Sequence, residues 1–300
     1  MKTFTGKTAV ITGAASGFGL EVSRKAAALG MNVVMADVQA DALTAAAAEI
    51  TGLGAQVLPY RLDVSVAAEV EALGAATVDR FGAPHIVFNN AGVACGGLVW
   101  EHSQADWEWV LGVNLWGVVH GVRVFTPMML DAARRDPDYE GHIVNTSSMA
   151  GLLAAPNMGV YNVSKHAVVA LSETLYQDLR LVTDQVTASV LCPYFVPTGI
   201  SKSERNRPAH AADQPTRSQL VARAMADKAV SSGKVTAAAV AQLVLDAIAE
   251  RRFYIYSHPQ ALGTVQTRME DLLTSRNPTD PFASRPEVGE QLRKALRAQD

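Results

Sequence analysis

The 300-residue sequence predicts an α/β protein with a doubly wound, parallel, seven-stranded sheet and helices on both faces. Short runs rich in β-branched residues alternate with longer runs rich in Ala and Leu, which is the order expected of consecutive βαβ units. The short runs are largely apolar throughout, as is typical of parallel strands that are buried on both faces. Hydrophobic residues make up 49% of the chain, so a protein of this length can bury a substantial core.

Seven short apolar runs are the expected strands. In chain order they are Thr8–Thr12, Asn32–Ala36, Gln56–Leu62, His85–Asn89, His142–Thr146, Val186–Leu191 and Phe253–Tyr256. The segments between them have helical length and composition: Leu20–Leu29, Ala40–Ile50, Ala67–Phe81, Ala105–Leu130, Val160–Leu181 and Thr236–Glu250. The sequence contains no internal repeat and no linker that would divide this series.

We therefore expect one domain over residues 1–257, followed by a C-terminal extension over residues 258–300. The extension begins with a helix-like stretch, Leu262–Leu273, and continues into a tail that contains Pro and Arg. Within the domain, residues 201–233 mix charges of both signs and predict a mobile or solvated segment.

The composition excludes several classes of protein. A formal net charge of -3 gives no basic excess for nucleic-acid binding. Cys95 and Cys192 are too few, and too irregularly spaced, for a disulfide scaffold or a metal site, and Cys95 is expected to be an inert small hydrophobe. No apolar stretch reaches the ~18 residues that span a membrane, and the first residues lack a signal-peptide core, so we expect a cytoplasmic protein.

A glycine-rich turn, ITGAASGFGL, follows the first expected strand and precedes a helix, which is the context of a dinucleotide fingerprint. Gly13, Gly17 and Gly19 permit positive φ and a close approach of backbone N–H groups to a pyrophosphate. The following helix N-terminus adds the positive end of its dipole. The spacing differs from the commoner Gly-x-Gly-x-x-Gly, and a plain tight turn is the alternative.

Asp37 ends the second expected strand, about 20 residues beyond the glycines. An acid there accepts hydrogen bonds from an adenosine ribose and repels a 2′-phosphate. No Arg or Lys follows at Val38 or Gln39, and none lies in the glycine turn, so we expect NAD rather than NADP. The alternative role, capping the helix that follows, is compatible with this one.

Six short motifs, in their order and spacing from Lys7 to Thr198, resemble those of the short-chain dehydrogenase/reductase family. They are TGAASGFG in the glycine turn, LDVS at Leu62–Ser65, NNAG at Asn89–Gly92, VNLWG, NTSS and YNVSK. The resemblance implies a Rossmann fold and a single-domain, NAD(P)(H)-dependent oxidoreductase that acts on CH–OH groups.

The same resemblance implies the site residues. Ser148 lies thirteen residues before Tyr161, which is the family's interval, whereas the neighbouring Ser147 does not fit it. The implied catalytic residues are Asn114, Ser148, Tyr161 and Lys165. The expected cofactor-binding residues are Gly13, Ser16, Gly17, Phe18, Gly19, Asp37, Asp63, Val64, Asn90, Ala91, Gly92, Tyr161, Lys165, Pro193, Val196 and Thr198. Tyr194 stands where the family usually has a glycine, which leaves the shape of the nicotinamide wall open.

The chemistry of Tyr161 and Lys165 follows from their separation of one helical turn, which places them on one face. The ammonium is expected to lower the pKa of the phenol, because a nearby positive charge favours the phenolate. Tyr161 would then donate a proton to a carbonyl oxygen, or remove one from an alcohol, while Ser148 hydrogen-bonds the same oxygen. By the resemblance, Lys165 also holds the nicotinamide ribose and Asn114 positions a water.

The segments expected at the carboxyl ends of the strands predict the substrate class. Met149–Met158 and Tyr194–Ile200 are largely apolar and offer no obvious Arg or Lys for an anionic group. We therefore expect a hydrophobic or aryl secondary alcohol or ketone, with residues 201–233 as a lid over it. The resemblance further implies a homodimer or homotetramer.

Two alternative functions remain. A catalytically silent, NAD-binding regulatory protein would be expected to lack one of the catalytic side chains. A nucleotide-sugar epimerase or dehydratase would more often carry a Gly-x-x-Gly-x-x-Gly turn and a larger C-terminal domain. A cluster of four tryptophans is expected in the core or a subunit interface rather than in a substrate platform: Trp100, Trp107, Trp109 and Trp116.

Overall fold

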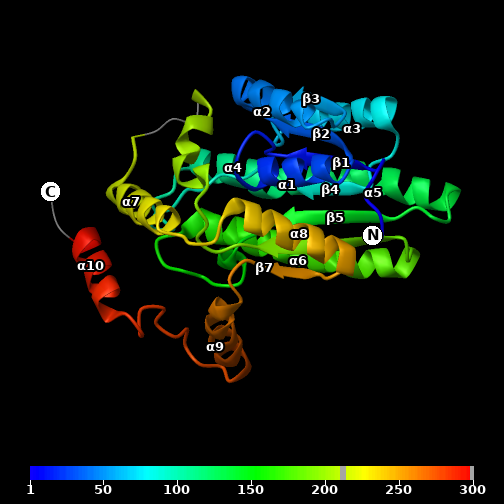
Figure 1. The fold of residues 1–300 in the computed structure, drawn as a ribbon. Coiled ribbons are helices and arrows are strands. Elements are labelled where there is room, and N and C mark those ends of the chain that lie inside the picture. The colour runs from blue at the N-terminus through cyan, green and yellow to red at the C-terminus, as the bar shows by residue number, and fades with distance from the viewer. Residues whose placement is uncertain (210–213, 298–300) are drawn as a thin grey trace.

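The computed structural model of the protein describes residues 1–209 and 214–297, and it confirms the predicted fold (Figure 1). Seven parallel strands form one sheet in the order β3-β2-β1-β4-β5-β6-β7. The strands are β1 (Thr8–Thr12), β2 (Asn32–Asp37), β3 (Val57–Arg61), β4 (Ile86–Asn89), β5 (Gly141–Thr146), β6 (Val186–Cys192) and β7 (Tyr254–Tyr256). The order reverses at the β1–β4 pair, and ligands of such sheets bind beyond the carboxyl ends of the strands at that reversal.

Helices cover both faces of the sheet and enclose two apolar cores. One face carries α1 (Gly17–Ala28), α2 (Ala40–Gly52) and α8 (Ala237–Glu250), and the other carries α3 (Ala67–Phe81), α5 (Gly117–Arg135) and α6 (Gly159–Val182). Successive residues of a strand point to opposite faces. Ile11 of β1 accordingly packs in the first core and Val10 in the second. This burial on both sides explains why the strands are apolar throughout.

The predicted helix Ala105–Leu130 is not continuous. The chain forms α4 (Gln104–Leu111), a π-helical turn at Gly112–Trp116, and then α5. At Gly117 the backbone passes so close to the loop after β3 that an added Cβ would lie 2.7 Å from Val64 Cγ2. The wide turn is therefore stabilised by tertiary contacts, which the helical composition of the segment does not reveal.

Residues 201–233, which the sequence predicts to be mobile or solvated, have regular secondary structure in the part that the structure describes. They contain most of a 3-10 helix, η3 (Gly199–Asn206), and the helix α7 (Arg217–Ser231), and many of their side chains are exposed. Their mobility stays a prediction. Thr216 and Gln219 form a capping box at the start of α7, and this pattern could have been found in the sequence. Residues 210–213 of the proposed lid lie outside the described residues.

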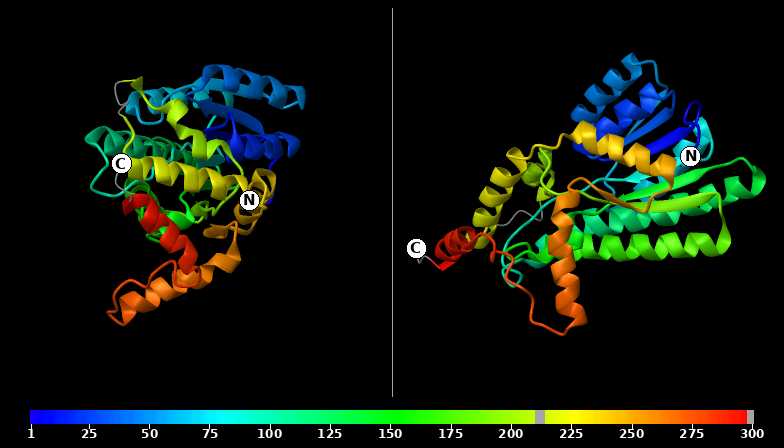
Figure 2. Two further views of the ribbon diagram at one scale, coloured as in Figure 1. Left: turned by 90° about the vertical axis from the view of Figure 1, so that its left-hand side faces the viewer. Right: turned by 60° about the horizontal axis from the view of Figure 1, so that its bottom comes forward.

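The C-terminal extension consists of a short 3-10 turn η5 (Pro259–Ala261), the helix α9 (Leu262–Leu273) and a further helix α10 (Pro286–Arg297). Figures 1 and 2 show α9 standing away from the layers of the sheet and α10 lying beside α7. Leu292 of α10 is buried, and Arg217 Nε of α7 donates a hydrogen bond of 2.7 Å to the Ala295 carbonyl. The extension therefore returns to the segment that follows β6.

None of the helices in residues 1–209 and 214–297 combines the length and the apolar character needed to cross a bilayer.

Candidate active site

The glycine turn lies at the carboxyl end of β1. There the backbone of the turn closely approaches the loop after β4 and the start of α1. Gly13 has φ +64°, and a Cβ on it would lie 3.0 Å from Ala91 Cα. A Cβ on Gly19 would lie 2.2 Å from the carbonyl oxygen of Gly13. Both glycines are therefore required by close packing, since any side chain would force the turn, the loop after β4 and α1 apart.

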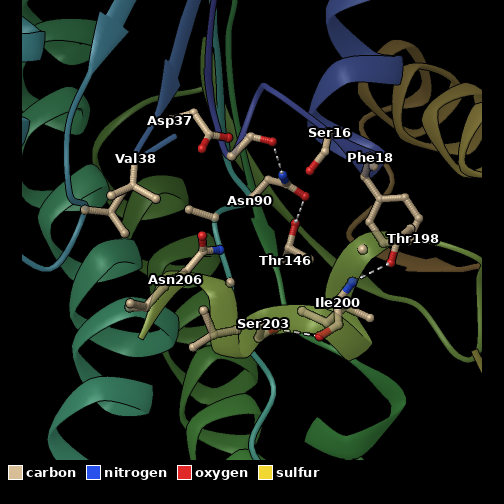
Figure 3. Close-up of a pocket in the computed structure, with 18 of the residues that line it drawn as sticks. Ser16, Phe18, Asp37, Val38, Asn90, Thr146, Thr198, Ile200, Ser203 and Asn206 are labelled. Carbon is tan, nitrogen blue, oxygen red and sulfur yellow. Dashed lines mark hydrogen bonds between the residues drawn. The ribbon is translucent and has the colours of Figure 1, made fainter. Parts of the chain in front are cut away.

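Asn90 ties this turn to the neighbouring strands (Figure 3). Its side-chain amide donates a hydrogen bond of 3.0 Å to the Thr12 carbonyl, and its backbone N–H donates one of 2.9 Å to Thr12 Oγ1. Thr146 Oγ1, at the end of β5, donates a hydrogen bond of 3.4 Å to Asn90 Oδ1. The Asn89–Gly92 segment thus braces three strand ends, which agrees with its expected role beside a cofactor.

Asp37 ends β2 and faces the same cavity as the glycine turn. Its Oδ2 accepts a hydrogen bond of 3.0 Å from the Ala15 N–H, and its Oδ1 accepts one of 3.0 Å from the Gln39 N–H. The residue at the N-cap of α2 is Gln39, so the alternative role of Asp37 as a helix cap is wrong. Each carboxylate oxygen keeps a further lone pair for a hydroxyl of a ligand.

The side chains of Tyr161 and Lys165 project from the first turns of α6. Lys165 is buried, its Nζ donates a hydrogen bond of 2.9 Å to the Thr146 carbonyl, and Nζ lies 5.8 Å from the centre of the Tyr161 ring. Ser148 precedes the 3-10 turn η2 (Met149–Gly151), and its hydroxyl accepts a hydrogen bond of 3.1 Å from the Ala150 N–H. Ser148, Tyr161 and Lys165, three of the four predicted catalytic residues, therefore line one cavity.

The pKa values of this group differ from the prediction. Burial raises the pKa of Tyr161, and the hydrogen bond with Ser148 offsets only part of this shift. Burial also lowers the pKa of Lys165 from 10.5 to about 8. The expected lowering of the phenol pKa by Lys165 is not found, because burial sets the direction of the shift and only the Ser148 hydrogen bond opposes it.

Asn114 lies behind the cavity rather than in its wall. It is completely buried in the π-helical turn, where its Oδ1 accepts a hydrogen bond of 2.8 Å from the Val93 N–H. Its Nδ2 donates to the Val93 carbonyl at 2.9 Å and to Ser164 Oγ at 3.1 Å. A Cβ on Gly92 would lie 3.4 Å from Asn114 Oδ1 and 3.6 Å from Lys165 Nζ, so the two polar groups approach the same glycine.

The loop after β6 forms a further wall. Its Pro193 carbonyl accepts hydrogen bonds from the Met149 N–H at 2.9 Å and from Ser148 Oγ at 3.3 Å. Tyr194 also lines the cavity, with its ring 4.3 Å from the ring of Phe195. The aromatic side chain thus takes the place of the family's glycine in the wall itself.

One cavity collects most of the predicted site residues (Figure 3). Those that line it are Gly13, Ser16, Gly17, Phe18, Asp37, Asp63, Val64, Asn90, Ala91, Gly92, Ser148, Tyr161, Lys165, Pro193, Val196 and Thr198. Asn114 and Gly19 do not line it: the first supports Val93, and the second packs under the turn.

Several further lining residues lie in Tyr194–Ile200 and in residues 201–233, which were expected at the substrate end, but no motif identifies them individually. They are Ile200, Ser203, Arg205, Asn206 and Val230. Asn206 accepts a hydrogen bond from Gln39, another lining residue that was not predicted. Trp109 also lines the cavity and is buried, whereas Trp100 and Trp116 are 75% and 53% exposed. Trp109 therefore lies in the core, and a place in a subunit interface stays a prediction for Trp100 and Trp116.

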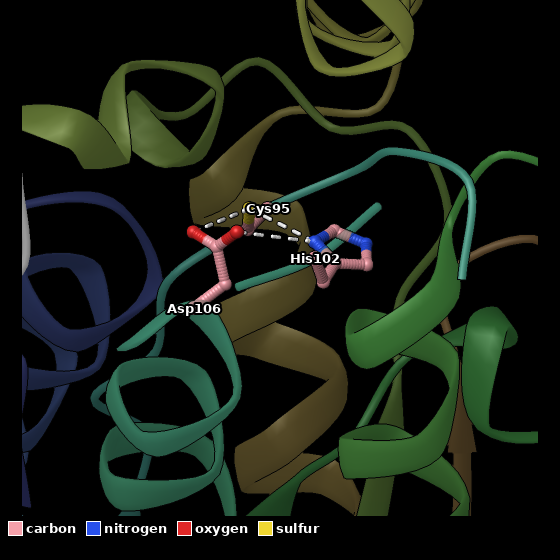
Figure 4. Close-up of side chains that lie close together, drawn as sticks. All are labelled: Cys95, His102 and Asp106. Atoms are coloured by element: carbon pink, nitrogen blue, oxygen red, sulfur yellow. Dashed lines mark hydrogen bonds and ion pairs between the residues drawn. The ribbon is translucent and has the colours of Figure 1, made fainter. Parts of the chain in front are cut away.

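A second polar cluster was also missed. Cys95, His102 and Asp106 lie within 4.8 Å of one another through their ligand atoms (Figure 4). Asp106 Oδ1 is already paired with Arg207 Nη1 at 2.7 Å, and burial raises the pKa of the Cys95 thiol to about 12. Because Arg207 already neutralises the Asp106 carboxylate, the arrangement favours an ion-pair cluster over a metal site. The absence of a metal stays a prediction.

Comparison with known proteins gives a consistent result. A family model described as short chain dehydrogenase matches residues 7–209. A solved short chain dehydrogenase/reductase from Burkholderia phymatum, in complex with NAD, is 54% identical, with a TM-score of 0.91 over 94% of this chain and 100% of that chain.

Two related proteins extend over most of the chain. A CLA biosynthesis dehydrogenase/reductase from Lactiplantibacillus plantarum is 32% identical and covers 93% of this chain and 97% of its own length. A 1-deoxy-11-beta-hydroxypentalenate dehydrogenase from Streptomyces exfoliatus is 35% identical and covers 89% of this chain and 88% of its own length.

Proposed function

Because the chain belongs to the short-chain dehydrogenase/reductase family, as its motifs predicted, we propose that it transfers a hydride between NAD(H) and a hydrophobic or aryl secondary alcohol or ketone. The chain is an oxidoreductase of this family with a Rossmann fold. The observation that carries the finer proposal is that Ser148, Tyr161 and Lys165 line the same cavity as the glycine turn and Asp37.

The residues present fit a nicotinamide dinucleotide. The backbone of the glycine turn is free of side chains where a pyrophosphate would approach, and Asp37 offers acceptors for a ribose hydroxyl. The NAD-bound neighbour supports the same cofactor class. The bound nicotinamide would supply or accept the hydride, while the protein contributes orientation and electrostatics.

The proposed proton transfer rests on Tyr161. Because burial raises its pKa, the phenol holds its proton at neutral pH and is ready to donate it to a carbonyl oxygen. Ser148 would hydrogen-bond the same oxygen, and Lys165 would hold the nicotinamide ribose. Asn114 would keep the π-helical turn against Val93 and position a water near Lys165.

The substrate class follows from the charges at the substrate end. Arg205 lines the main cavity, and its Nη1 donates hydrogen bonds to the Gly199 carbonyl at 2.8 Å and to the Lys202 carbonyl at 2.7 Å. Arg207 and Arg223 line the second cavity and are paired with Asp106 at 2.7 Å and with Glu204 at 3.2 Å. An anionic substrate would have to compete with these carbonyl and carboxylate partners, whereas a neutral, apolar substrate would not.

Turnover of a substrate panel tests the proposal. With NAD at pH 8, neutral aryl and alkyl secondary alcohols should produce absorbance of reduced nicotinamide, while carboxylated, phosphorylated and polyhydroxylated alcohols should produce much less. A clear preference for the anionic or polyhydroxylated compounds would refute the substrate class. Cofactor binding without any turnover would favour the regulatory alternative.

Replacing Asp37 by Ala should relax the preference for NAD. The ratio of kcat/KM with NAD to that with NADP is expected to fall by at least about tenfold, because the carboxylate repels a 2′-phosphate. Asp37→Asn should behave similarly, since it removes the charge and keeps the shape. Asp41→Ala removes an exposed acid of α2 and serves as the control. An unchanged ratio in Asp37→Ala would disprove the assigned role.

Four coarser expectations are proposed alongside. A homodimer or homotetramer is supported by family membership, and a cytoplasmic location by two buried cysteines that form no disulfide. The division into a domain at residues 1–257 and an extension at 258–300 is supported by the sheet ending at β7. A lid at residues 201–233 is supported by the residues of η3 and α7 that line the cavity.

A further inference from the structure

The substrate side of the cavity is covered by a segment held to the body by polar contacts. We name the covering segment as residues 199–209 and 214–231, which include η3 and α7. It faces the loop after β4 and the start of α4. Ser203 Oγ accepts a hydrogen bond of 2.9 Å from the Ala94 N–H, and Ser218 Oγ accepts one of 3.0 Å from the Leu98 N–H.

The carboxylate of Asp106 joins both parts of the covering segment to α4. Its Oδ1 pairs with Arg207 Nη1 at 2.7 Å, and its Oδ2 accepts a hydrogen bond of 2.8 Å from Gln219 Nε2. Oδ2 also accepts a hydrogen bond of 3.0 Å from the Ser103 N–H, as part of the capping box of α4. Arg207 precedes residues 210–213 and Gln219 follows them, so one side chain holds the two described parts together.

The contacts are buried, which distinguishes them from an ordinary surface ion pair. The side chain of Asp106 is 4% exposed and that of Arg207 is 10% exposed. The guanidinium of Arg207 also lies 4.3 Å from the centre of the Trp109 ring, and Trp109 lines the main cavity. Burial acts to raise the pKa of Asp106, but hydrogen bonds from Arg207 and Ser103 outweigh it, so the pKa is lowered and the group is ionised at neutral pH.

The same contacts border a second cavity beside the main one. Its walls come from the body, through Ala94, Cys95 and Met158, and from the covering segment, through Arg207 and Ala222. Asp106 lines this second cavity between the residues of the body and those of the covering segment. A change in its contacts therefore alters the wall of the substrate side without touching the glycine turn or α6.

We propose that Asp106 is a positioning residue: its carboxylate holds the covering segment in place before substrate arrives, and so sets substrate affinity. This inference rests on the proposed function, since it concerns the substrate of that site. A segment that is already ordered adds little entropy cost to substrate binding. A released segment must become ordered when substrate binds, and this entropy cost weakens the affinity for substrate. Asp106 acts through Arg207 and Gln219 and takes no part in the chemistry.

Asp106→Asn is the main test. The substitution keeps the size and one acceptor but removes the charge, so KM for the alcohol is expected to rise by about tenfold, with kcat and the Kd for NAD nearly unchanged. The control, Asp227→Asn, makes the same change at an exposed acid of α7 whose partner is Ser201, and it should leave KM unchanged. An unchanged KM in Asp106→Asn, or an equal loss in kcat, would overturn the inference.

A double-mutant cycle tests whether Arg207 is the partner. Arg207→Gln should raise KM by at least as much as Asp106→Asn, because it removes the pair with Asp106 and also the pair with Glu204 at 2.8 Å. The double variant should be no worse than the more affected single variant. Additive effects would show that the two side chains act independently and would contradict the proposal.

Hydrogen exchange separates this inference from the proposed function. In Asp106→Asn, amides in residues 199–209 and 214–231 should exchange at least about tenfold faster, while amides of β1, β4 and β5 keep their rates. Faster exchange throughout the molecule, or no change in the covering segment, would disprove the positioning role. If the unsubstituted protein turns over no alcohol or ketone, the proposed function fails, but the exchange result still decides this inference.

Discussion

Replacing Tyr161 by Phe is expected to lower kcat/KM by about 10³-fold and to leave the Kd for NAD unchanged. The substitution removes the proton donor and keeps the ring, so α6 and the buried Lys165 retain their packing. Because the pKa of Tyr161 is raised, the phenol is protonated at neutral pH, and its loss should be felt most directly in carbonyl reduction. Steady-state rates in both directions and a cofactor titration measure the effect.

The matched control is Tyr139→Phe. Tyr139 is also a buried tyrosine, but its hydroxyl donates a hydrogen bond to the Pro84 carbonyl, and it does not line the cavity. Its loss should lower stability by about 1 kcal/mol and leave kcat/KM unchanged. Turnover that survives in Tyr161→Phe would place the proton transfer on another group. Loss of cofactor binding in that variant would assign Tyr161 a structural role instead.

Replacing Lys165 by Met is expected to abolish most activity and, at neutral pH, to stabilise the protein. The ammonium is buried, and its pKa falls from 10.5 to about 8 on folding, so the charged form disfavours the native state. This shift corresponds to about 3 kcal/mol. Part of the gain is lost with the hydrogen bond to the Thr146 carbonyl, which leaves a net stabilisation of about 1–2 kcal/mol.

The pH dependence gives the sign of this effect. Below about pH 8 Lys165 is protonated in both the folded and the unfolded chain, and the full cost is present. Between about pH 8 and 10.5 the folded chain has lost this proton while the unfolded chain still holds it, so stability rises with pH. The advantage of Lys165→Met should therefore shrink across this window.

Denaturant unfolding of both proteins at pH 7 and pH 10 measures the difference. Lys234→Met, at an exposed lysine between α7 and α8, is the control and should show a pH-independent difference. A Lys165→Met variant that is less stable than the parent at pH 7, with a difference that does not depend on pH, would show that the buried charge of Lys165 does not destabilise the folded protein.

Much of the fold could be predicted because the sheet is buried on both faces. Largely apolar runs such as Asn32–Ala36 mark the strands, and their alternation with helical segments predicts the parallel order. The division of Ala105–Leu130 could not be predicted in this way. The π-helical turn depends on the contact of Asn114 with Val93, 21 residues away, and both flanking segments have helical composition.

The site was predictable where it depends on motifs and less so where it depends on tertiary contacts. The glycine turn, Asp37, Ser148 and Tyr161 lie in short motifs, and the structure brings them to one cavity. The contact of Asp106 with Arg207 joins residues that are 101 positions apart, and no local sequence pattern predicts it. The direction of the Tyr161 pKa shift was mispredicted because spacing shows that a lysine is near but does not show how deeply both groups are buried.

The helix α10 has a consequence for how this protein can evolve. It lines no part of the main cavity, yet it packs on α7, whose residue Val230 does line it, and it holds Arg217 through the Ala295 carbonyl. Inherited changes in this terminal helix can therefore shift the wall of the cavity while every lining residue stays the same. Relatives with identical cavity residues can therefore differ in the compounds they accept through substitutions within α10 (Pro286–Arg297).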